Sequence, residues 1–465
     1  MKALSFAAVA LALATTLAVT RGPESGRAVP QHRWPMFQYN VEHNPVFARP
    51  DWDVSWRTSI GKKSNGGISI VGSTLYIDSF DHKVYAIDAR TGAIRWQTKL
   101  PDVLMNTPIV DHGIVIVGTG TAHMLHDSST YWVAGRKAGD EIAGLDQKTG
   151  RVLWTFHTVG EDMPTGALVR TKDGEQFVFT GGDDHIYGIN ARNGKLIWKQ
   201  KAYGIDGMAP VTVVRGLVLG IDTLGDSGYF QRIGEGKNPD IAWGRTWAID
   251  PSRGGRYVWK IPYGVADASI AVGGELAFIQ GFALVNPTGK LAADLARRIG
   301  FGAFANSVAD FSTLVTAVDL HTGKRVWTYH SSPGPNLTVG SAAFSSEGLY
   351  HRGVAYEPLA FARQLVAFRA RTGRVLWKLN TKYPVKTGAV IARGLLYFGD
   401  SGGFFYVVDA HNGRILHVLH FDGPPNHSGF AKSPAVIVGK TLFVSDSHYV
   451  MALRLEDLDR GIARF

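Results

Sequence analysis

The stretch Ala86–Trp96 reads AIDARTGAIRW, and close copies of it recur along the chain. The copies share a small residue, an apolar residue, usually Asp, two variable residues, Thr/Asn-Gly, three more residues and Trp. The others are GLDQKTGRVLW (144–154), GINARNGKLIW (188–198), AIDPSRGGRYVW (248–259), AVDLHTGKRVW (317–327), AFRARTGRVLW (367–377) and the degenerate VVDAHNGRILH (407–417). Self-similarity at intervals of 40 to 68 residues predicts a repeat architecture.

Each copy predicts a β-hairpin. The Asp ends one strand, the Gly supplies a positive φ angle in the turn, and the alternating run to Trp forms the next strand. Two further strand-like runs precede each copy, such as GISIVG (67–72) and STLYIDS (73–79). Four strands per repeat are the unit of a propeller blade. The tryptophans are interpreted as structural residues that dock between neighbouring blades, namely Trp56, Trp96, Trp154, Trp198, Trp259, Trp327 and Trp377.

The two ends of the chain complete the count of blades. After His417, the runs SPAVIVG, KTLFVSD and YVMALRL supply three strands without a tryptophan strand. The missing strand is DVSWRTSI, around Trp56. An N-terminal strand that completes the last blade would close the ring without an exposed edge. The sequence therefore predicts an all-β, eight-bladed propeller as a single domain over residues 33–458.

Composition limits the class of protein. The chain has 465 residues, a net charge of +10, 45% hydrophobic residues and no cysteine. The absence of cysteine excludes disulfide scaffolds, thiolate metal sites and cysteine nucleophiles. Lys and Arg are scattered through the turns, without the interleaved aromatic residues of a nucleic-acid groove. We therefore expect no nucleic-acid partner and interpret the charge as a solvated basic surface, with polyanion binding as the alternative.

The first residues indicate export. Lys2 is followed by an uncharged, Ala/Leu-rich run from Ala3 to Val19 and then by Arg21. A basic start, a short apolar core and small residues near its end are typical of a secretory signal peptide. An uncleaved membrane anchor is the alternative, for which the run is short and weakly apolar. We expect residues 1–20 to be a signal peptide and the mature protein to be periplasmic, without a transmembrane span.

Unequal repeat lengths locate the variable loops. Insertions fall near His123–Asp140, Asp222–Trp243 and Ala283–Phe311. In the last of these, Leu291, Leu295 and Ile299 have helical spacing and predict one short helix. Long loops on a rigid scaffold are where binding usually resides.

The repeat resembles the tryptophan-docking motif of the pyrroloquinoline quinone (PQQ) enzyme family, over essentially the whole mature chain. That family includes eight-bladed quinoprotein alcohol dehydrogenases and the non-enzymatic BamB-like proteins. In the dehydrogenases, PQQ lies at the centre of the ring over a Ca²⁺ with Glu and Asn ligands, an Asp is the general base, and a vicinal disulfide packs on the cofactor. Because the repeated residues are structural, the resemblance is specific for the fold and weak for the function.

The resemblance places candidate site residues in this chain. Where the family has adjacent cysteines, residues 63–67 read KSNGG. His123 stands in place of the Glu, Asp183 near the Asn and Asp206 near the base. The resemblance implies His123 and Asp183 as cofactor-binding residues, Asp206 as the catalytic residue, and all three as metal ligands. Imidazole is a poor ligand for Ca²⁺ and suits zinc or a transition metal better. The alternative is that the three are ordinary polar residues of a central funnel.

Two functions remain after this comparison. The first is an exported, BamB-like binding or scaffold module that serves outer-membrane or periplasmic assembly or ligand binding, with a protein partner or small ligand at the propeller face. It requires no cofactor. The alternative is a divergent PQQ-dependent dehydrogenase that oxidises an alcohol or a sugar and uses PQQ with Ca²⁺. The missing cysteines and the His-for-Glu exchange favour the first function.

Overall fold

The computed structural model of the chain describes residues 28–62, 64, 66–120, 140–158, 165–182, 185–202, 209–223, 244–262, 268–284, 310–335, 347–421, 429–430, 434–446 and 448–462. The predicted signal peptide (1–20) and the predicted short helix around Leu291, Leu295 and Ile299 lie outside these residues. Within them, no helix is long and apolar enough to cross a membrane.

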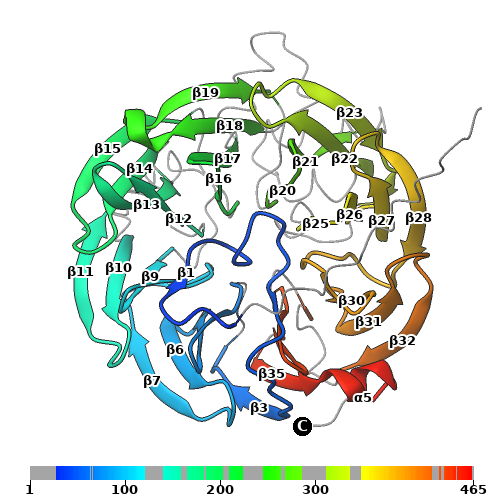
Figure 1. Ribbon diagram of the computed structural model, residues 1–465, viewed down its shortest axis with the longest axis horizontal. Coiled ribbons are helices and arrows are strands. Elements are labelled where there is room, and N and C mark those ends of the chain that lie inside the picture. The colour runs from blue at the N-terminus through cyan, green and yellow to red at the C-terminus, as the bar shows by residue number, and fades with distance from the viewer. Residues whose placement is uncertain are drawn as a thin grey trace, which may run out of the picture.

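Eight antiparallel sheets are arranged around a central axis as the blades of a propeller (Figure 1). In each blade the first strand lies nearest the axis and the fourth forms the outer rim. The first blade contains β4 (Ser69–Val71), β5 (Thr74–Ser79), β6 (Lys83–Asp88) and β7 (Ile94–Lys99), and the second contains β8 (Ile109–Asp111), β9 (Ile114–Gly118), β10 (Glu141–Asp146) and β11 (Val152–His157). The third blade contains β12 (Ala167–Thr171), β13 (Gly174–Gly181), β14 (His185–Asn190) and β15 (Leu196–Lys201). The fourth contains β16 (Thr212–Val214), β17 (Leu217–Thr223), β18 (Gly244–Asp250) and β19 (Arg256–Ile261). The fifth blade contains β20 (Ala271–Gly273), β21 (Leu276–Leu284), β22 (Asp310–Asp319) and β23 (Arg325–His330). The sixth contains β25 (Leu349–His351), β26 (Val354–Leu359), β27 (Gln364–Arg369) and β28 (Arg374–Asn380). The seventh contains β29 (Val390–Ala392), β30 (Leu395–Gly399), β31 (Phe404–Asp409) and β32 (Ile415–His420).

The eighth blade joins the two ends of the chain. It contains β33 (Val436–Val438), β34 (Thr441–Ser445), β35 (Tyr449–Arg454) and, as its outer strand, β3 (Trp56–Ser59). β3 pairs antiparallel with β35, with Trp56 opposite Ala452. The predicted eight-bladed fold and its closure by the N-terminal strand are thereby confirmed. A short helix, α5 (Leu455–Asp459), follows β35.

The repeated Asp and Gly form the turn between the third and fourth strands. In the first blade, Asp88 Oδ1 accepts hydrogen bonds from the backbone N–H groups of Arg90 at 2.9 Å and Thr91 at 3.2 Å. Gly92 has a φ angle of 74°. Glycine adopts this left-handed conformation without the steric penalty of a side chain, so the motif specifies the turn.

Each tryptophan of the repeat packs against the turn glycine of the next blade. A Cβ atom on Gly92 would lie 2.8 Å from the Trp56 ring, closer than side-chain carbons come to their neighbours. The pairs are Trp56–Gly92, Trp96–Gly150, Trp154–Gly194, Trp198–Gly255, Trp259–Gly323, Trp327–Gly373 and Trp377–Gly413. The imidazole of His417 lies in the same way against Gly461, beyond α5. The same contact therefore joins every blade to the next around the ring.

Most of these indole N–H groups also donate a hydrogen bond. Five donate to a backbone carbonyl of the neighbouring turn at 2.7–3.1 Å, from Trp56, Trp96, Trp259, Trp327 and Trp377. Trp198 differs because its Nε1 donates to Gln176 Oε1 of its own blade at 2.7 Å. A buried indole N–H needs such an acceptor, so these bonds fix the orientation of the rings.

The stretch Pro30–Phe47, which we call the central segment, runs through the middle of the ring (Figure 1). It contains β1 (Arg33–Trp34), which pairs with β8, and β2 (Val46–Phe47), which pairs with β33. It accepts hydrogen bonds from the first strand or first turn of seven blades, through the backbone N–H groups of Gly72, His112, Leu168, Val272, Tyr350, Ile391 and Ile437. In the fourth blade, Met36 shares an apolar cluster with Val211 and Val218. The central segment thus contacts all eight blades.

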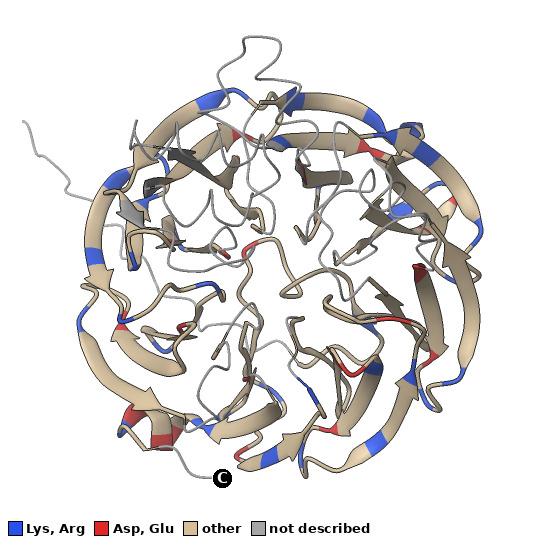
Figure 2. Cartoon of the chain, turned by 180° about the vertical axis from the view of Figure 1, so that it is seen from behind, with Lys and Arg blue, Asp and Glu red and all other residues tan. Residues whose placement is uncertain are grey.

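In the described part of the chain, the basic side chains do not gather in one patch (Figure 2). Figure 2 shows Lys and Arg spread around the outer strands of the ring, and several pair with nearby carboxylates. The basic charge of the described residues is therefore dispersed over the rim.

Candidate functional site

The three predicted site residues, His123, Asp183 and Asp206, lie outside the described residues. Their flanking strands are described, however. His123 falls between β9 and β10, Asp183 between β13 and β14, and Asp206 between β15 and β16. In antiparallel blades, the connections from second to third strand and from blade to blade leave at the same face. We call this the loop face, and the three predicted insertions also fall between second and third strands.

A ring of buried polar side chains marks the loop-face ends of the second strands. One residue occurs in each blade: Asp78, Thr119, Thr180, Asp222, Gln280, Glu357, Asp400 and Ser445. Each is 2% exposed or less. We call this set the polar collar. Sequence reasoning missed it, although the polar residue that ends each apolar run, as in TLYID (74–78), was a usable signal.

The collar carboxyl groups are held by hydrogen bonds within the protein. Asp78 accepts from Asn106 N at 2.6 Å and from Ser64 Oγ at 3.2 Å. Burial raises the pKa of Asp78 to about 8, against the opposing effect of these bonds. Asp400 accepts from Tyr406 OH at 2.8 Å and from the backbone N–H of Gly402 at 2.9 Å. Its segment, GDSGG (399–403), resembles a protease nucleophile loop in sequence but forms the hairpin turn between β30 and β31.

The central segment contributes two polar side chains at this level of the ring. Gln38 Nε2 donates to Glu347 Oε2 at 3.4 Å. His43 Nδ1 lies 3.2 Å from both the carbonyl oxygen of Gly348 and Ser269 Oγ. Burial lowers the pKa of His43 to about 4, so the imidazole is neutral at neutral pH. The central segment is thereby attached to the fifth and sixth blades by hydrogen bonds.

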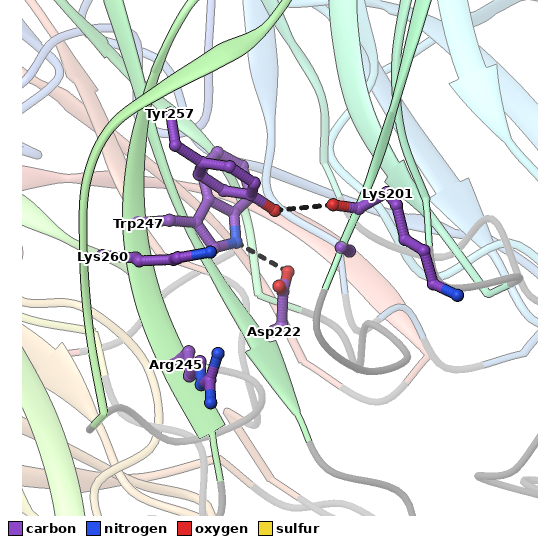
Figure 3. Close-up of a pocket in the computed structure, with 7 residues that line it drawn as sticks. Lys201, Asp222, Arg245, Trp247, Tyr257 and Lys260 are labelled. Carbon is purple, nitrogen blue, oxygen red and sulfur yellow. Dashed lines mark hydrogen bonds between the residues drawn. The ribbon is translucent and has the colours of Figure 1, made fainter.

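A cavity of about 100 Å³ lies at the loop face between the third and fourth blades (Figure 3). We call it the cationic pocket. Its lining residues come from β15, β17, β18 and β19, or directly follow them: Lys201, Ala202, Asp222, Arg245, Trp247, Tyr257 and Lys260. Sequence reasoning missed this set too, because its members are dispersed over 60 positions and belong to no motif.

Hydrogen bonds fix the walls of the cationic pocket. Trp247 Nε1 donates to Asp222 Oδ1 at 2.6 Å, and Tyr257 OH donates to the carbonyl oxygen of Lys201 at 2.9 Å. Burial, and then the charge of Asp222, raise the pKa of Tyr257 well above its usual value, so the phenol stays neutral. The ammonium of Lys260 lies 4.7 Å from the centre of the Tyr257 ring.

The charged groups of the pocket have a defined arrangement. In Figure 3, Arg245 and Lys260 lie on the same side of Asp222, whereas the ammonium of Lys201 points away from it. Two cationic side chains and one carboxylate therefore line the same part of the pocket. Arg and Lys are the side chains that bind oxyanions, Arg through its planar fork and Lys as a point charge. This chemistry suits an anionic ligand.

The described residues do not fit the PQQ–Ca²⁺ site that the resemblance implies. The chain has no cysteine, so the vicinal disulfide is absent. Among the described residues of the loop face, Asp78 and Asp400 are engaged by protein donors. The group of metal-ligating side chains that the described part of the chain does contain lies at the opposite face.

The repeats, the eight blades and the N-terminal closing strand define a propeller of the PQQ-repeat class. The family described as "Outer membrane protein assembly factor BamB" matches residues 46–219 and 311–458, more than half of the chain. The chain belongs to this family, as the tryptophan repeat predicted.

Individual relatives divide between enzymes and assembly factors. The tetrathionate hydrolase of Acidithiobacillus ferrooxidans is 27% identical over 422 residues, covering 85% of this chain and 73% of the relative. The outer membrane protein assembly factor BamB of Yersinia pestis is 24% identical over 242 residues, covering 48% of this chain and 53% of the relative. A solved europium-containing methanol dehydrogenase superposes with a TM-score of 0.60 and 16% identity, covering 90% of each chain. The last likeness shows the shared fold.

Proposed function

We propose that the protein hydrolyses a polythionate, the class of sulfur oxyanion to which tetrathionate belongs, with the substrate bound at the loop face. The structural observation that carries this proposal is the cationic pocket between the third and fourth blades. The comparisons support the substrate class, because the tetrathionate hydrolase aligns with 85% of this chain and the BamB relative with 48%.

Arg245 and Lys260 are the proposed binding residues. Tetrathionate is a dianion with a sulfonate group at each end, and one sulfonate would lie against these two cations. Asp222 is held by the Trp247 indole at 2.6 Å and lines the same pocket as Arg245 and Lys260. The neutral phenol of Tyr257 offers no charge that would repel the substrate.

Hydrolysis of a sulfur–sulfur bond needs only water. The water oxygen bonds to one sulfur, the bonding pair leaves with the other sulfur, and the two protons of water are released. The reaction therefore requires no electron acceptor, whereas the oxidation of an alcohol by a quinoprotein does. This difference separates the two enzymatic interpretations experimentally.

The test uses the purified mature protein with tetrathionate and no added acceptor. We expect tetrathionate loss, followed by ion chromatography, together with release of acid. Lys260→Ala and Arg245→Ala should each raise KM about tenfold, because each removes one charged contact. Lys378→Ala is the matched control, since its ammonium lies 5.2 Å from the Tyr329 ring on a distant blade. No loss of tetrathionate with any preparation of folded protein would overturn the proposal.

The second candidate function is the binding or scaffold role, which the family match supports. It predicts no turnover of tetrathionate and recovery of the protein with outer-membrane assembly components after cross-linking. A PQQ-dependent dehydrogenase would instead reduce a dye when PQQ, Ca²⁺ and an alcohol are added. No activity in either enzyme assay, together with a cross-linked envelope partner, would establish the scaffold role.

Both functions include export, which we propose from residues 1–20. The proposal predicts a periplasmic protein whose N-terminus lies between about residues 15 and 30. N-terminal sequencing of protein released by osmotic shock tests it. Full-length chain in the membrane fraction would show an uncleaved anchor instead.

A further inference from the structure

Three potential metal ligands meet at the face opposite the loop face. Asp111 ends β8 in the second blade, His112 follows it in the turn, and Glu175 lies in β13 of the third blade. One ligand atom from each lies within 4.8 Å of the others. The sequence gives no motif for this group because 63 positions separate His112 from Glu175.

The environment of the Asp111 carboxylate indicates that it binds a ligand. Its side chain is 1% exposed, and among the described residues neither carboxylate oxygen receives a hydrogen bond. The nearest basic atom, His112 Nε2, is 3.6 Å from Oδ1. A buried carboxylate without donors is strongly destabilising unless a positive charge compensates it.

The donor set indicates the kind of cation. Two carboxylates with one imidazole suit Zn²⁺ and other divalent transition metals better than Ca²⁺ or Mg²⁺, which prefer oxygen ligands alone. His112 has an exposed side chain and can present either ring nitrogen. Its ring stacks on that of His32 with centroids 6.3 Å apart, which restricts its orientation.

Two arginines compete with a metal for Glu175. Arg33 Nη2 lies 2.8 Å from Glu175 Oε1, and Arg170 Nη2 lies 3.9 Å from Oε2. Their side chains are 34% and 69% exposed, so each can turn into solvent when a cation binds. Asp111 makes no such ion pair with an arginine among the described residues, and it is the ligand that gains most.

We propose that Asp111, His112 and Glu175 bind a divalent transition metal ion of the Zn²⁺ type, which joins the second blade to the third. The site lies beside the start of the central segment, because β1 pairs with β8 through Arg33 opposite Asp111. The bound ion would hold the first residues of the central segment in place. This role is structural and is independent of the chemistry at the loop face.

The experiment titrates Zn²⁺ into the metal-free mature protein by calorimetry. We expect one zinc site per chain and a rise of several degrees in Tm, because an ion that binds only the folded state stabilises that state. Asp111→Asn and Glu175→Gln should each weaken binding at least tenfold. Glu275→Gln is the matched control, because Glu275 lies 2.9 Å from His321 Nε2 beside Arg215 in an exposed cluster. Its zinc binding should equal that of the unaltered protein.

Two further variants keep the test decisive. Metal-free Asp111→Asn should be at least as stable as the metal-free parent, because the amide replaces a buried carboxylate that receives no hydrogen bond, yet its Tm should not respond to Zn²⁺. Arg33→Ala should tighten zinc binding, since it removes a competing cation. If Asp111→Asn does not fold, the zinc affinities of Arg33→Ala and His112→Asn test the proposal instead. Absence of stoichiometric zinc binding, or equal binding in all variants, would overturn the proposal. It would indicate instead that the carboxyl groups of Asp111 and Glu175 share a proton.

Discussion

Gln280 Nε2 donates a 2.7 Å hydrogen bond to Glu357 Oε2, and this bond joins the second strands of the fifth and sixth blades. Both side chains are 2% exposed or less. Burial raises the pKa of Glu357 to about 8, against the opposing effect of the bond from Gln280. The two neighbours in the polar collar are therefore connected by a carboxyl group that is mostly protonated at neutral pH.

The first prediction is that stability falls as the pH rises from about 6.5 to about 8. Glu357 and Asp78 each have a folded-state pKa of about 8, above the ordinary values of 4.5 and 3.8. A raised pKa means that the folded state binds the proton more tightly, so its stabilising contribution is lost as the pH passes through the folded-state value. Each group should contribute a loss on the order of 1–2 kcal/mol over this range.

Thermal denaturation at closely spaced pH values measures this loss. His43 acts only below the range, because its lowered pKa of about 4 affects stability between about 4 and 6.5. Glu357→Gln should flatten the pH dependence by about half. Glu275→Gln should leave it unchanged, since the pKa of the exposed Glu275 is lowered to about 2 by hydrogen bonds from Arg215 and His321. A Tm independent of pH would contradict this account.

The second prediction concerns closure of the ring. Trp56 packs on Gly92 and donates to the carbonyl oxygen of Ala89 at 3.1 Å. Trp56→Ala should destabilise the protein by about 3–5 kcal/mol, as truncation of a buried Trp does elsewhere. If residues 33–458 form one cooperative domain, as the sequence predicts, a single unfolding transition will move as a whole. His417→Ala should have a smaller effect than Trp377→Ala, and equal Tm values for parent and Trp56→Ala would refute the prediction.

The third prediction separates backbone conformation from the contact with tryptophan. Gly92 and Gly113 both have positive φ angles, 74° and 91°. A Cβ on Gly92 would meet the Trp56 ring, whereas one on Gly113 would meet nothing within 4 Å. Gly113→Ala should therefore cost only about 1 kcal/mol of stability, and Gly92→Ala roughly 2 kcal/mol more. Denaturant titration checks this, and equal losses would mean that the ring contact contributes nothing.

The fourth prediction tests how the central segment is held. The Asn44 side chain accepts from Ile391 N at 2.9 Å and donates to Ile391 O at 3.2 Å, so it pairs with β29 as a strand would. Asn44→Ala should cost about 1–3 kcal/mol, because both groups of Ile391 lose their partner. Hydrogen exchange should quicken at Ile391 and remain unchanged in β14. Unaltered protection of Ile391 would show that the bond is dispensable.

The fold could be predicted from the sequence because its determinants are local. Asp88, Gly92 and Trp96 lie within nine positions, and each acts through the turn or strand that it occupies. Repetition then supplied the number of blades, and the unmatched strand around Trp56 supplied the closure. The docking role of the tryptophans stays a prediction until Trp56→Ala is measured, although their packing on glycine accords with it.

The sites could not be predicted because their parts come from distant strands. Asp78 ends an apolar run that signals a strand end, but only the tertiary fold buries it with Glu357 and the other members of the polar collar. The central segment has no periodic pattern, since it contacts eight different sheets, seven through hydrogen bonds and the fourth through apolar packing. His123, Asp183 and Asp206 were located by resemblance alone and lie beyond the described part of the chain, so their roles remain predictions.

The central segment also constrains when the protein can reach its native state. Asn44 bonds to Ile391, 347 positions later, and β2 pairs with β33 near the end of the chain. The central segment therefore cannot complete its contacts until β29 and β33 have been synthesised. The ring can therefore close only after the strands of the eighth blade have been synthesised. Premature termination before β33 would leave both β2 and β3 unpaired, which would expose the defective product to proteolysis.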